Sequence, residues 1–451
     1  MKVPPDMISR IPFKISVTPR VGPLWQRRRI QVSGAVPGSV VTVRARTDRN
    51  GDEWTAQASF LADANGSIDL GSQAPVSGDY RCADAMGLFW SQCLASGGAG
   101  KSEPADVRIP IKTELVAWEE TGTGYLDMEG PAARGQEHRL TVEQWLLAED
   151  TQRIEVRSND LVGTLFRPAG EGVFPTVIVM NGSGGGINET RAAQYASRGI
   201  QAFALGYFRA PGLSNYISRT PLEYFERALD YVAAELSPRG GKPVVSGQSR
   251  GGELTLLLAS RFPEKIAGIA AFVPGAFVFG AQGAADPADG WNGPTWTWQG
   301  QALPHFWDNN TGVTWQPWSA DAAPSRHADV YIDGLHDRNL AMQSRIPIEQ
   351  FKGPVACVSG LDDRAWPSSM ASRMVMNTLE RHGHAAERLH LDFDSAGHGI
   401  GMPFLPSTSI QVLHPVSQVA YSNGGTPPGN ARASETSFEE ICAFIERSTK
   451  A

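Results

Sequence analysis

A serine enclosed by two glycines lies between a strand-forming run and a helix-forming run, and this feature restricts the possible folds most strongly. Residues 243–246 favour a strand, residues 247–251 have the spacing G-x-S-x-G, and residues 251–260 favour a helix. A sharp turn of this kind lifts the hydroxyl of Ser249 above the end of a sheet, and side chains larger than glycine would clash in it. Chance alone yields roughly 0.4 such pentapeptides in a chain of this composition, so the flanking runs carry the inference.

From about residue 150 onward, strand-length and helix-length runs alternate along the chain. Unbroken apolar runs are typical of strands that are buried on both faces. Alternation with helices predicts a mostly parallel, doubly wound α/β sheet, in which ligands bind at the carboxyl ends of the strands. The predicted strands are residues 176–180, 201–205, 244–246, 269–273, 355–358 and 388–391, with a helix over 190–198 between the first two.

A second helix is predicted to begin at Thr220. Its hydroxyl is suited to cap the helix, Pro221 would occupy the first turn, and Glu223 follows three residues after the cap. Apolar residues then recur at helical spacing and give the helix one buried face, made of Leu222, Phe225, Leu229, Val232 and Leu236.

Residues 10–145 have a different pattern, of short alternating runs separated by turn sequences. The turns include Pro37-Gly38, Asn50-Gly51 and Asn65-Gly66. This spacing predicts an antiparallel, immunoglobulin-like β-sandwich. Because no cluster of His, Asp and Glu occurs there, we interpret it as a supporting module. We therefore expect a sandwich domain over 10–145 and a catalytic domain over 146–451.

A tryptophan-rich insertion over about 276–325 interrupts the alternation of strands and helices. Six of the twelve tryptophans of the chain lie between Trp291 and Trp318, among Gly, Pro and Asn. A segment that is both apolar and irregular must pack over either the core or a ligand cleft. Two interpretations stay open, an aromatic patch that packs the insertion against the core and a cap that covers the substrate.

Composition and charge argue against several classes of protein. The chain has 40 Lys and Arg against 47 Asp and Glu, without basic blocks, which argues against a nucleic-acid partner. No stretch approaches the ~20 apolar residues of a membrane span, and residues 1–20 lack the apolar core of a signal peptide. The cysteines form neither a disulfide framework nor a metal set, so we expect a soluble, cytoplasmic protein; they are Cys82, Cys93, Cys357 and Cys442.

A serine nucleophile in this fold needs a carboxylate and a histidine, in the order Ser…Asp/Glu…His. Asp363 follows one predicted strand and His398, flanked by glycines, follows the next. We therefore predict Ser249 as the nucleophile, His398 as the general base and Asp363 as the group that orients the imidazole. Asp362 stays an alternative to Asp363.

Two backbone N–H groups are predicted to stabilise an oxyanion. One belongs to Arg250 at the start of the helix, and the other to Ser183 in the glycine-rich loop 181–186. A phosphate cradle is the competing interpretation of this loop. It is disfavoured because no G-x-G-x-x-G leads into a helix and no Gly-Lys-Ser/Thr follows. The expected chemistry requires no cofactor and no metal.

Together these motifs resemble the family of acyl-CoA thioesterases and bile acid-CoA:amino acid N-acyltransferases. The resemblance implies a β-sandwich joined to an α/β-hydrolase domain, with Ser249, Asp363 and His398 as a catalytic triad acting on acyl-CoA or related acyl thioesters. It runs through most of the chain, and its more specific segments are Met-Gly-Leu-Phe-Trp-Ser at 86–91 and the serine-centred Ser-Arg-Gly-Gly-Glu-Leu at 249–254. Gly-Leu-Asp-Asp at 360–363 and Ala-Gly-His at 396–398 complete the set.

This sequence also departs from the family pattern. The amino-acid-transferring members typically have cysteine as the nucleophile, so serine at position 249 favours hydrolysis. Transfer of the acyl group to an amino acid remains an alternative, as does action as an esterase or as a thioesterase on a carrier protein. The tryptophan-rich insertion has no counterpart that we can place. The terminal Ser-Thr-Lys-Ala is not a peroxisomal address.

Overall fold

The computed structural model describes residues 11–98, 100–121, 133–313 and 326–450, which form two compact units. The first unit comprises Met1–Leu146 together with Phe404–Ser409, and the second comprises Leu147–Pro403 and Ile410–Ala451. No helix within the described ranges is both long enough and apolar enough to cross a lipid bilayer.

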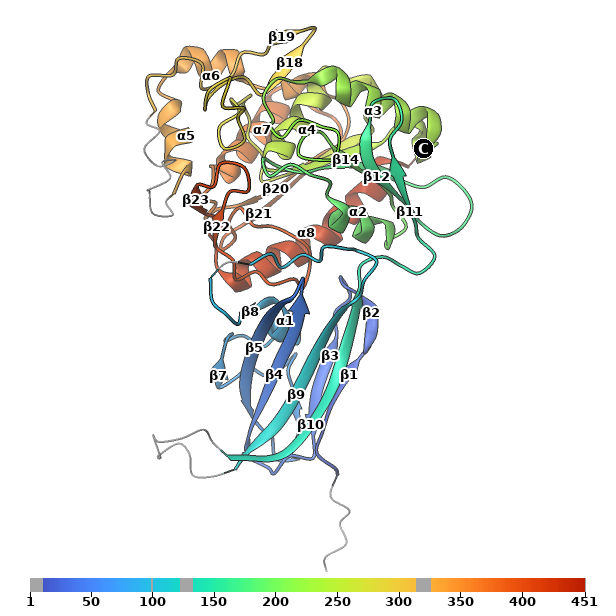
Figure 1. Cartoon of the computed structure of the whole chain (residues 1–451), viewed down its shortest axis with the longest axis vertical. Helices are drawn as coiled ribbons and strands as arrows, with labels where there is room; N and C mark the ends of the chain where they lie inside the picture. The colour runs from blue at the N-terminus through green and yellow to red at the C-terminus, as the bar shows by residue number, and fades with distance from the viewer. Residues whose placement is uncertain (1–10, 99, 122–132, 314–325, 451) are drawn as a thin grey trace, which may run out of the picture. The chain divides into compact units, whose positions relative to one another are not determined.

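The first unit is built from two β-sheets, which confirms the predicted β-sandwich (Figure 1). Its longest strands pair as antiparallel neighbours, and residues along β5 alternate between buried and exposed positions. One sheet has the order β1 (Lys14–Thr18), β3 (Arg29–Ser33), β6 (Ile68–Asp69). The other has the order β2 (Val21–Pro23), β10 (Ala133–Trp145), β9 (Ile111–Thr121), β4 (Val40–Arg49), β5 (Asp52–Leu61), β7 (Ser77–Gly78), with β8 (Cys93–Leu94) beside β5.

The hairpin between β4 and β5 turns at Asn50 and Gly51, as the sequence predicts. Both residues have positive φ, 58° and 89°. Two consecutive residues with positive φ match the twist of a tight hairpin, and asparagine and glycine tolerate this conformation best. The short helix α1 (Gly87–Trp90) follows later in this unit and is buried throughout.

A distant segment of the chain, Phe404–Ser409, also belongs to the first unit. The Ser407 N–H donates to the carbonyl oxygen of Trp90 at 3.0 Å, and the Thr408 hydroxyl donates to that of Gln92 at 2.7 Å. These bonds attach the segment just after α1.

The second unit contains an eight-stranded, mostly parallel sheet, which confirms the predicted α/β class. Only β12 runs antiparallel to its neighbours, and β13, β14, β17 and β20 are buried along their whole length. The order is β11 (Gln152–Val156), β12 (Val162–Arg167), β14 (Gln201–Gly206), β13 (Thr176–Met180), β16 (Val244–Gln248), β17 (Gly268–Phe272), β20 (Val355–Gly360), β21 (Arg388–Phe393).

Helices cover both faces of this sheet (Figure 1). Helices α2 (Glu189–Ala196) and α8 (Pro427–Ser448) lie on one face. The opposite face carries α3 (Leu222–Glu235), α4 (Arg250–Arg261) and α7 (Ser368–Arg381). Because both faces of the sheet are covered, its central strands are buried on both sides, which explains their unbroken apolar sequences.

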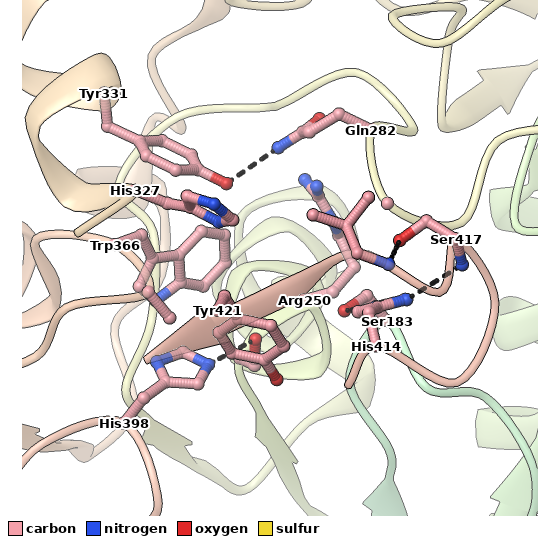
Figure 2. Close-up of a pocket in the computed structure, with 14 residues that line it drawn as sticks. Ser183, Arg250, Gln282, His327, Tyr331, Trp366, His398, His414, Ser417 and Tyr421 are labelled. Carbon is pink, nitrogen blue, oxygen red and sulfur yellow. Dashed lines mark hydrogen bonds between the residues drawn. The ribbon is translucent and has the colours of Figure 1, made fainter. Parts of the chain in front are cut away.

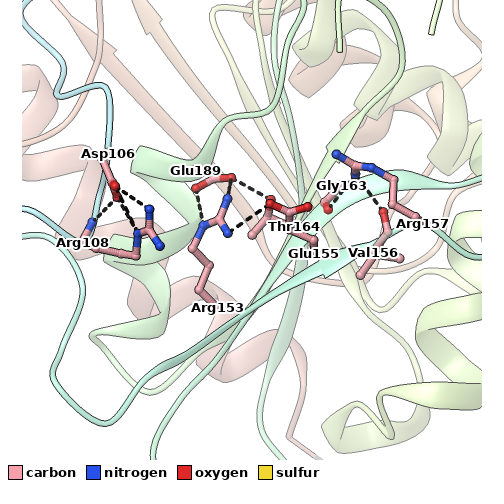
Figure 3. A network of polar contacts seen from close by, with 9 residues as sticks. All are labelled: Asp106, Arg108, Arg153, Glu155, Val156, Arg157, Gly163, Thr164 and Glu189. Atoms are coloured by element: carbon pink, nitrogen blue, oxygen red, sulfur yellow. Dashed lines mark hydrogen bonds and ion pairs between the residues drawn. The ribbon is translucent and has the colours of Figure 1, made fainter. Parts of the chain in front are cut away.

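An ion pair attaches α2 to the antiparallel edge of the sheet (Figure 3). The Arg153 guanidinium on β11 donates to the Glu189 carboxylate at 2.8 and 2.6 Å, and the Thr164 hydroxyl on β12 donates to it at 2.7 Å. The hydrogen bonds that Arg153 donates to Glu189 raise the pKa of Arg153. At the start of α2, Asn188 accepts from the Arg191 N–H and donates to the side chain of Asn181. This helix therefore fixes the glycine-rich loop that follows β13.

The predicted start of α3 at Thr220 is wrong. Residues Thr220 and Pro221 instead form β15, which pairs with β18 (Trp296–Trp298), and the Thr220 hydroxyl donates to the carbonyl oxygen of Ile217 at 2.7 Å. Strand pairing therefore uses the residue that would have capped the helix. The predicted apolar face is found, with Leu222, Phe225, Leu229 and Val232 buried and Leu236 partly buried.

The tryptophan-rich insertion is described up to residue 313, so Trp315 and Trp318 lie outside the described residues. Within the described part, Trp296 and Trp307 are fully buried in the core of the second unit. The Trp307 ring contacts Phe306 and Tyr331 edge-on and Phe279 at a tilt, at centroid distances of 4.9–5.4 Å. The short strand β19 (Gln301–Ala302) and the helices α5 (Ala328–Gly334) and α6 (Arg338–Ser344) complete this region.

Candidate active site

Ser249 occupies the turn between β16 and α4, as the sequence predicts. Its backbone has φ 59° and ψ −119°, a strained conformation for a residue with a side chain. The flanking glycines make the turn feasible: a Cβ at Gly247 would lie 2.2 Å from the carbonyl oxygen of Gly251, and a Cβ at Gly251 would lie 2.4 Å from that of Asn181. The Ser249 N–H donates to the carbonyl oxygen of Phe272 at 2.9 Å, which holds the turn against β17.

His398 lies between Ser249 and Asp363. Its Nε2 is 2.8 Å from the Ser249 hydroxyl oxygen, and its Nδ1 is 2.8 Å from Oδ2 of Asp363. A carboxylate only accepts hydrogen bonds, so Nδ1 carries the proton and Nε2 is left to accept one from the serine hydroxyl. The structure thus brings together the three side chains that the sequence singles out as a triad.

Asp363 is buried and held on both carboxylate oxygens. Its Oδ1 accepts from the backbone N–H groups of Ala365 and Trp366 at 3.0 and 3.2 Å, and its Oδ2 accepts from the Ser368 hydroxyl at 2.5 Å. These bonds fix the carboxylate at the end of β20 and aim it at the imidazole.

Asp362, the alternative acid, is engaged elsewhere. It forms an ion pair with Arg364 at 3.0 Å and accepts from the Gly425 N–H at 2.9 Å. Burial acts to raise the pKa of Asp362, but the hydrogen bonds from Arg364 and Gly425 outweigh it and lower that pKa. Asp362 therefore contributes no contact to His398.

The loop that carries His398 is anchored on α8 and on the segment before it. The His398 N–H donates to the carbonyl oxygen of Asn423 at 2.7 Å, and the Gly397 N–H donates to the side chain of Asn430 at 2.8 Å. A Cβ at Gly397 would lie 2.2 Å from the Asn423 carbonyl oxygen, so only glycine allows this close approach. The ring of Trp366 meets the His398 ring edge-on at 5.9 Å.

The glycine-rich loop after β13 passes directly beside the nucleophile. A Cβ at Gly182 would lie 2.9 Å from the carbonyl oxygen of Gln248 and 3.0 Å from Cβ of Ser249. The next residue, Ser183, lines one cavity with Ser249, Arg250 and His398. Arg250 is the first residue of α4, so its N–H has no acceptor within the helix. The two residues predicted to supply the oxyanion donors therefore both line the cavity beside Ser249, and their role as donors stays a prediction.

The Arg250 side chain is buried and paired with a carboxylate. Its Nη1 lies 2.6 Å from Oε2 of Glu253, and its guanidinium packs over the rings of Phe279 and Trp366 at 5.8 and 5.6 Å. Glu253 also accepts from the Trp296 indole N–H at 3.0 Å. Burial raises the pKa of Glu253 against the opposing effect of Arg250. The pair joins the first turn of α4 to the tryptophan-rich insertion.

Most side chains around the cavity are polar, and sequence reasoning did not find them. They come from loops far apart in the chain, without a motif that marks them. Besides the predicted residues, the cavity is lined by Gln282, Gly283, His327, Tyr331, Ala365, Trp366, His414, Ser417, Val419 and Tyr421 (Figure 2). Among the described residues, no group of three or more His, Cys, Asp and Glu side chains is arranged to hold a metal ion.

The fold and the contacting serine, histidine and aspartate define an α/β hydrolase. Residues 220–451 match the family described as BAAT / Acyl-CoA thioester hydrolase C terminal, and residues 26–158 match the Acyl-CoA thioester hydrolase/BAAT N-terminal region. The chain belongs to this family, which confirms the resemblance seen in its motifs.

Similar proteins extend over nearly the whole chain. Acyl-coenzyme A thioesterase 6 of Mus musculus is 28% identical over 438 residues, 96% of each chain. Acyl-coenzyme A thioesterase 1 of Homo sapiens is 28% identical over 422 residues, 93% of this chain and 92% of the human protein. Among solved structures, the Pyrococcus horikoshii acylaminoacyl peptidase aligns with 94% of this chain and 60% of its own, at 14% identity and a TM-score of 0.42.

Proposed function

We propose that this protein hydrolyses acyl-CoA or related acyl thioesters through a Ser249–His398–Asp363 triad and an acyl-enzyme intermediate. The observation that carries the proposal is the continuous chain of hydrogen bonds from Asp363 through His398 to Ser249, each 2.8 Å long. Membership of the family and similarity to proteins named acyl-coenzyme A thioesterases support a thioester as the substrate.

In the first half of the reaction the serine is acylated. Nε2 of His398 takes the hydroxyl proton as the Ser249 oxygen attacks the thioester carbonyl carbon, and Asp363 stabilises the imidazolium. The backbone N–H groups of Arg250 and Ser183 stabilise the negative oxygen of the tetrahedral intermediate. The intermediate collapses by breaking the carbon–sulfur bond, and the leaving thiolate takes the proton from His398.

In the second half, water releases the acyl group. His398 Nε2 takes a proton from a water molecule as its oxygen attacks the ester carbonyl carbon. When the bond to the Ser249 oxygen breaks, His398 returns the proton to that oxygen. The products are a free carboxylic acid and a free thiol, and the enzyme regains its starting state.

Transfer to an amine differs only in this second half, because an amino acid would replace water. Serine as the nucleophile favours hydrolysis in our interpretation. Mass spectrometry of the products formed from an acyl-CoA, with and without glycine or taurine, separates free acid from N-acyl amino acid. A predominant N-acyl product would replace hydrolysis by transfer.

The decisive test is Ser249→Ala, assayed with short, medium and long acyl-CoAs and with simple esters. We expect turnover to fall by at least about 10³-fold while the unfolding temperature stays unchanged. A fluorophosphonate probe should label the wild type and fail to label the variant. Ser260→Ala serves as the control, because the hydroxyl that it removes donates its hydrogen bond to the carbonyl oxygen of Leu256 within the same helix. Near-wild-type turnover in Ser249→Ala would exclude the mechanism.

A further inference from the structure

A second serine–histidine pair faces the same cavity as the triad. Nε2 of His414 lies 2.9 Å from the hydroxyl oxygen of Ser183 (Figure 2). Both residues line the cavity beside Ser249. Ser183 belongs to the glycine-rich loop after β13, and His414 follows the short strand β22 (Gln411–Leu413). The mechanism above uses the Ser183 backbone only, so the role of the two side chains is open.

The surroundings of His414 fix where its proton sits. Its Nδ1 lies 3.2 Å from the Val416 backbone nitrogen and 3.3 Å from that of Ser417. Backbone N–H groups only donate, so Nδ1 accepts and carries no proton. Burial lowers the pKa of His414 to about 4, helped by the charges of Arg209, Arg250 and His327. The ring is therefore neutral near pH 7, with its proton on Nε2.

This assignment excludes a second nucleophile at Ser183. A base must offer a free lone pair to the hydroxyl, as Nε2 of His398 does for Ser249. Nε2 of His414 instead donates its proton to the Ser183 oxygen. The Ser183 hydroxyl has no other hydrogen bond within the described part of the chain, so its own proton is free to be donated elsewhere. Because Ser183 lines the cavity, a bound substrate can accept this proton.

The loop that carries Ser183 also passes close to the nucleophile. The residue before Ser183 approaches the nucleophile so closely that a Cβ at Gly182 would lie 3.5 Å from the Ser249 hydroxyl oxygen. An acyl carbonyl attacked by Ser249 must place its oxygen beside this loop if the Ser183 N–H is to reach it. The same oxygen is then available as an acceptor for the Ser183 hydroxyl, which lines the same cavity.

We propose that the Ser183 hydroxyl donates a third hydrogen bond to the oxyanion, and that His414 is a positioning residue that holds this hydroxyl in the donating orientation. The inference rests on the proposed function, because it assumes that Ser249 attacks a carbonyl. A donor that is already oriented needs no rearrangement as charge develops, so its effect falls on the transition state. It should therefore lower kcat and leave KM nearly unchanged when it is removed.

Single and double variants at the two positions test the proposal. Ser183→Ala should lower kcat by about 10²-fold, the scale of one lost oxyanion donor. His414→Leu should lower it about tenfold, since the hydroxyl then rotates freely, whereas His414→Gln should retain most activity because its amide nitrogen can donate. In the Ser183→Ala background, His414→Leu should cause no further loss. An equal loss from His414→Leu in both backgrounds would mean that His414 acts by packing alone.

The rate at which a fluorophosphonate labels Ser249 gives a readout that does not depend on the thioester. The phosphonyl oxygen occupies the position of the oxyanion, so Ser183→Ala should slow labelling at least about tenfold. Circular dichroism and the unfolding temperature establish that each variant is folded. Wild-type labelling by folded Ser183→Ala would overturn the inference, whatever the substrate. Normal labelling of the wild type without thioester hydrolysis would count against the proposed substrate and leave this inference standing.

Discussion

His398 Nε2 and the Ser249 hydroxyl oxygen lie 2.8 Å apart, although 149 residues separate them in the chain. The contact depends on two supports. The turn at Ser249 is packed against β17, and the loop of His398 is bonded to Asn423 and Asn430. Both supports belong to the second unit, in which the sheet brings the ends of β16, β20 and β21 to one edge.

Asp363 should be essential for turnover, and Asp362 should not. Asp363→Asn places an amide against Nδ1 of His398, which favours the wrong tautomer, and we expect kcat to fall by about 10⁴-fold. Asp362→Asn removes the partly exposed ion pair with Arg364 and keeps one oxygen that can accept from the Gly425 N–H, so its kcat should stay near that of the wild type. Steady-state kinetics of the two purified variants decide the assignment. Equal losses at both positions would contradict it.

The local part of the site could be predicted because its elements are contiguous in the sequence. The strand, the glycine-flanked serine and the helix follow one another within residues 243–261, and the geometry of the turn dictates the glycines. Asp363 and His398 could be singled out because each directly follows a strand of a parallel sheet. Parallel strands end at the same edge, so their following loops meet.

The missed features depend on contacts between loops. His414 contacts Ser183, which lies 231 residues away in the chain. The loop that carries His414 has no periodic pattern of apolar residues from which its path could be predicted. Thr220 has the local signature of a helix cap, but pairing with Trp296 places it in a strand. In both cases a tertiary contact determines the local structure, and such a contact cannot be predicted from local propensity.

The close approach of Gly182 to the nucleophile predicts that this glycine cannot be replaced without loss of activity. A Cβ there would lie 2.9 Å from a backbone oxygen of the turn, so Gly182→Ala must shift the loop and with it the Ser183 N–H. We expect kcat to fall about tenfold or more, because small misplacements of catalytic groups are costly. Gly401→Ala, which meets no atom within 4 Å, is the control. Unchanged kinetics of Gly182→Ala would show that the loop does not take part.

Tyr331 should limit the length of the acyl chain. It lines both the cavity beside Ser249 and a neighbouring apolar cavity walled by Phe277, Phe279, Phe306, Leu335 and Met370. Trp366 lines both cavities as well, and we expect Tyr331→Ala to open a passage between them beside that ring. Each methylene buried there adds about 0.8 kcal/mol, so two should raise the preference for longer chains roughly tenfold.

The measurement is kcat/KM for a series of straight-chain acyl-CoAs of increasing length. Tyr331→Phe keeps the ring and loses only the hydroxyl that accepts from Gln282, so its length profile should match that of the wild type. The alanine variant loses a buried aromatic ring, at a cost of about 3–5 kcal/mol, and should be assayed well below its unfolding temperature. If the two variants have the same profile, Tyr331 does not set the chain length.

His414 should make the stability of the protein depend on pH in the acidic range. Its pKa is lowered from 6.5 to about 4 by burial and by Arg209, Arg250 and His327. Between these values the unfolded chain binds a proton that the folded protein excludes. The stability contributed by the neutral ring is therefore complete above pH 6.5 and is lost as the pH falls toward 4. Between pH 7 and pH 4.5 this group should remove about 2–3 kcal/mol from the free energy of unfolding.

His414→Gln cannot ionise, so urea denaturation at the two pH values should show a correspondingly smaller loss for the variant. An equal loss in both proteins would mean that His414 already binds its proton in the folded state, and would also remove the basis for placing its proton on Nε2.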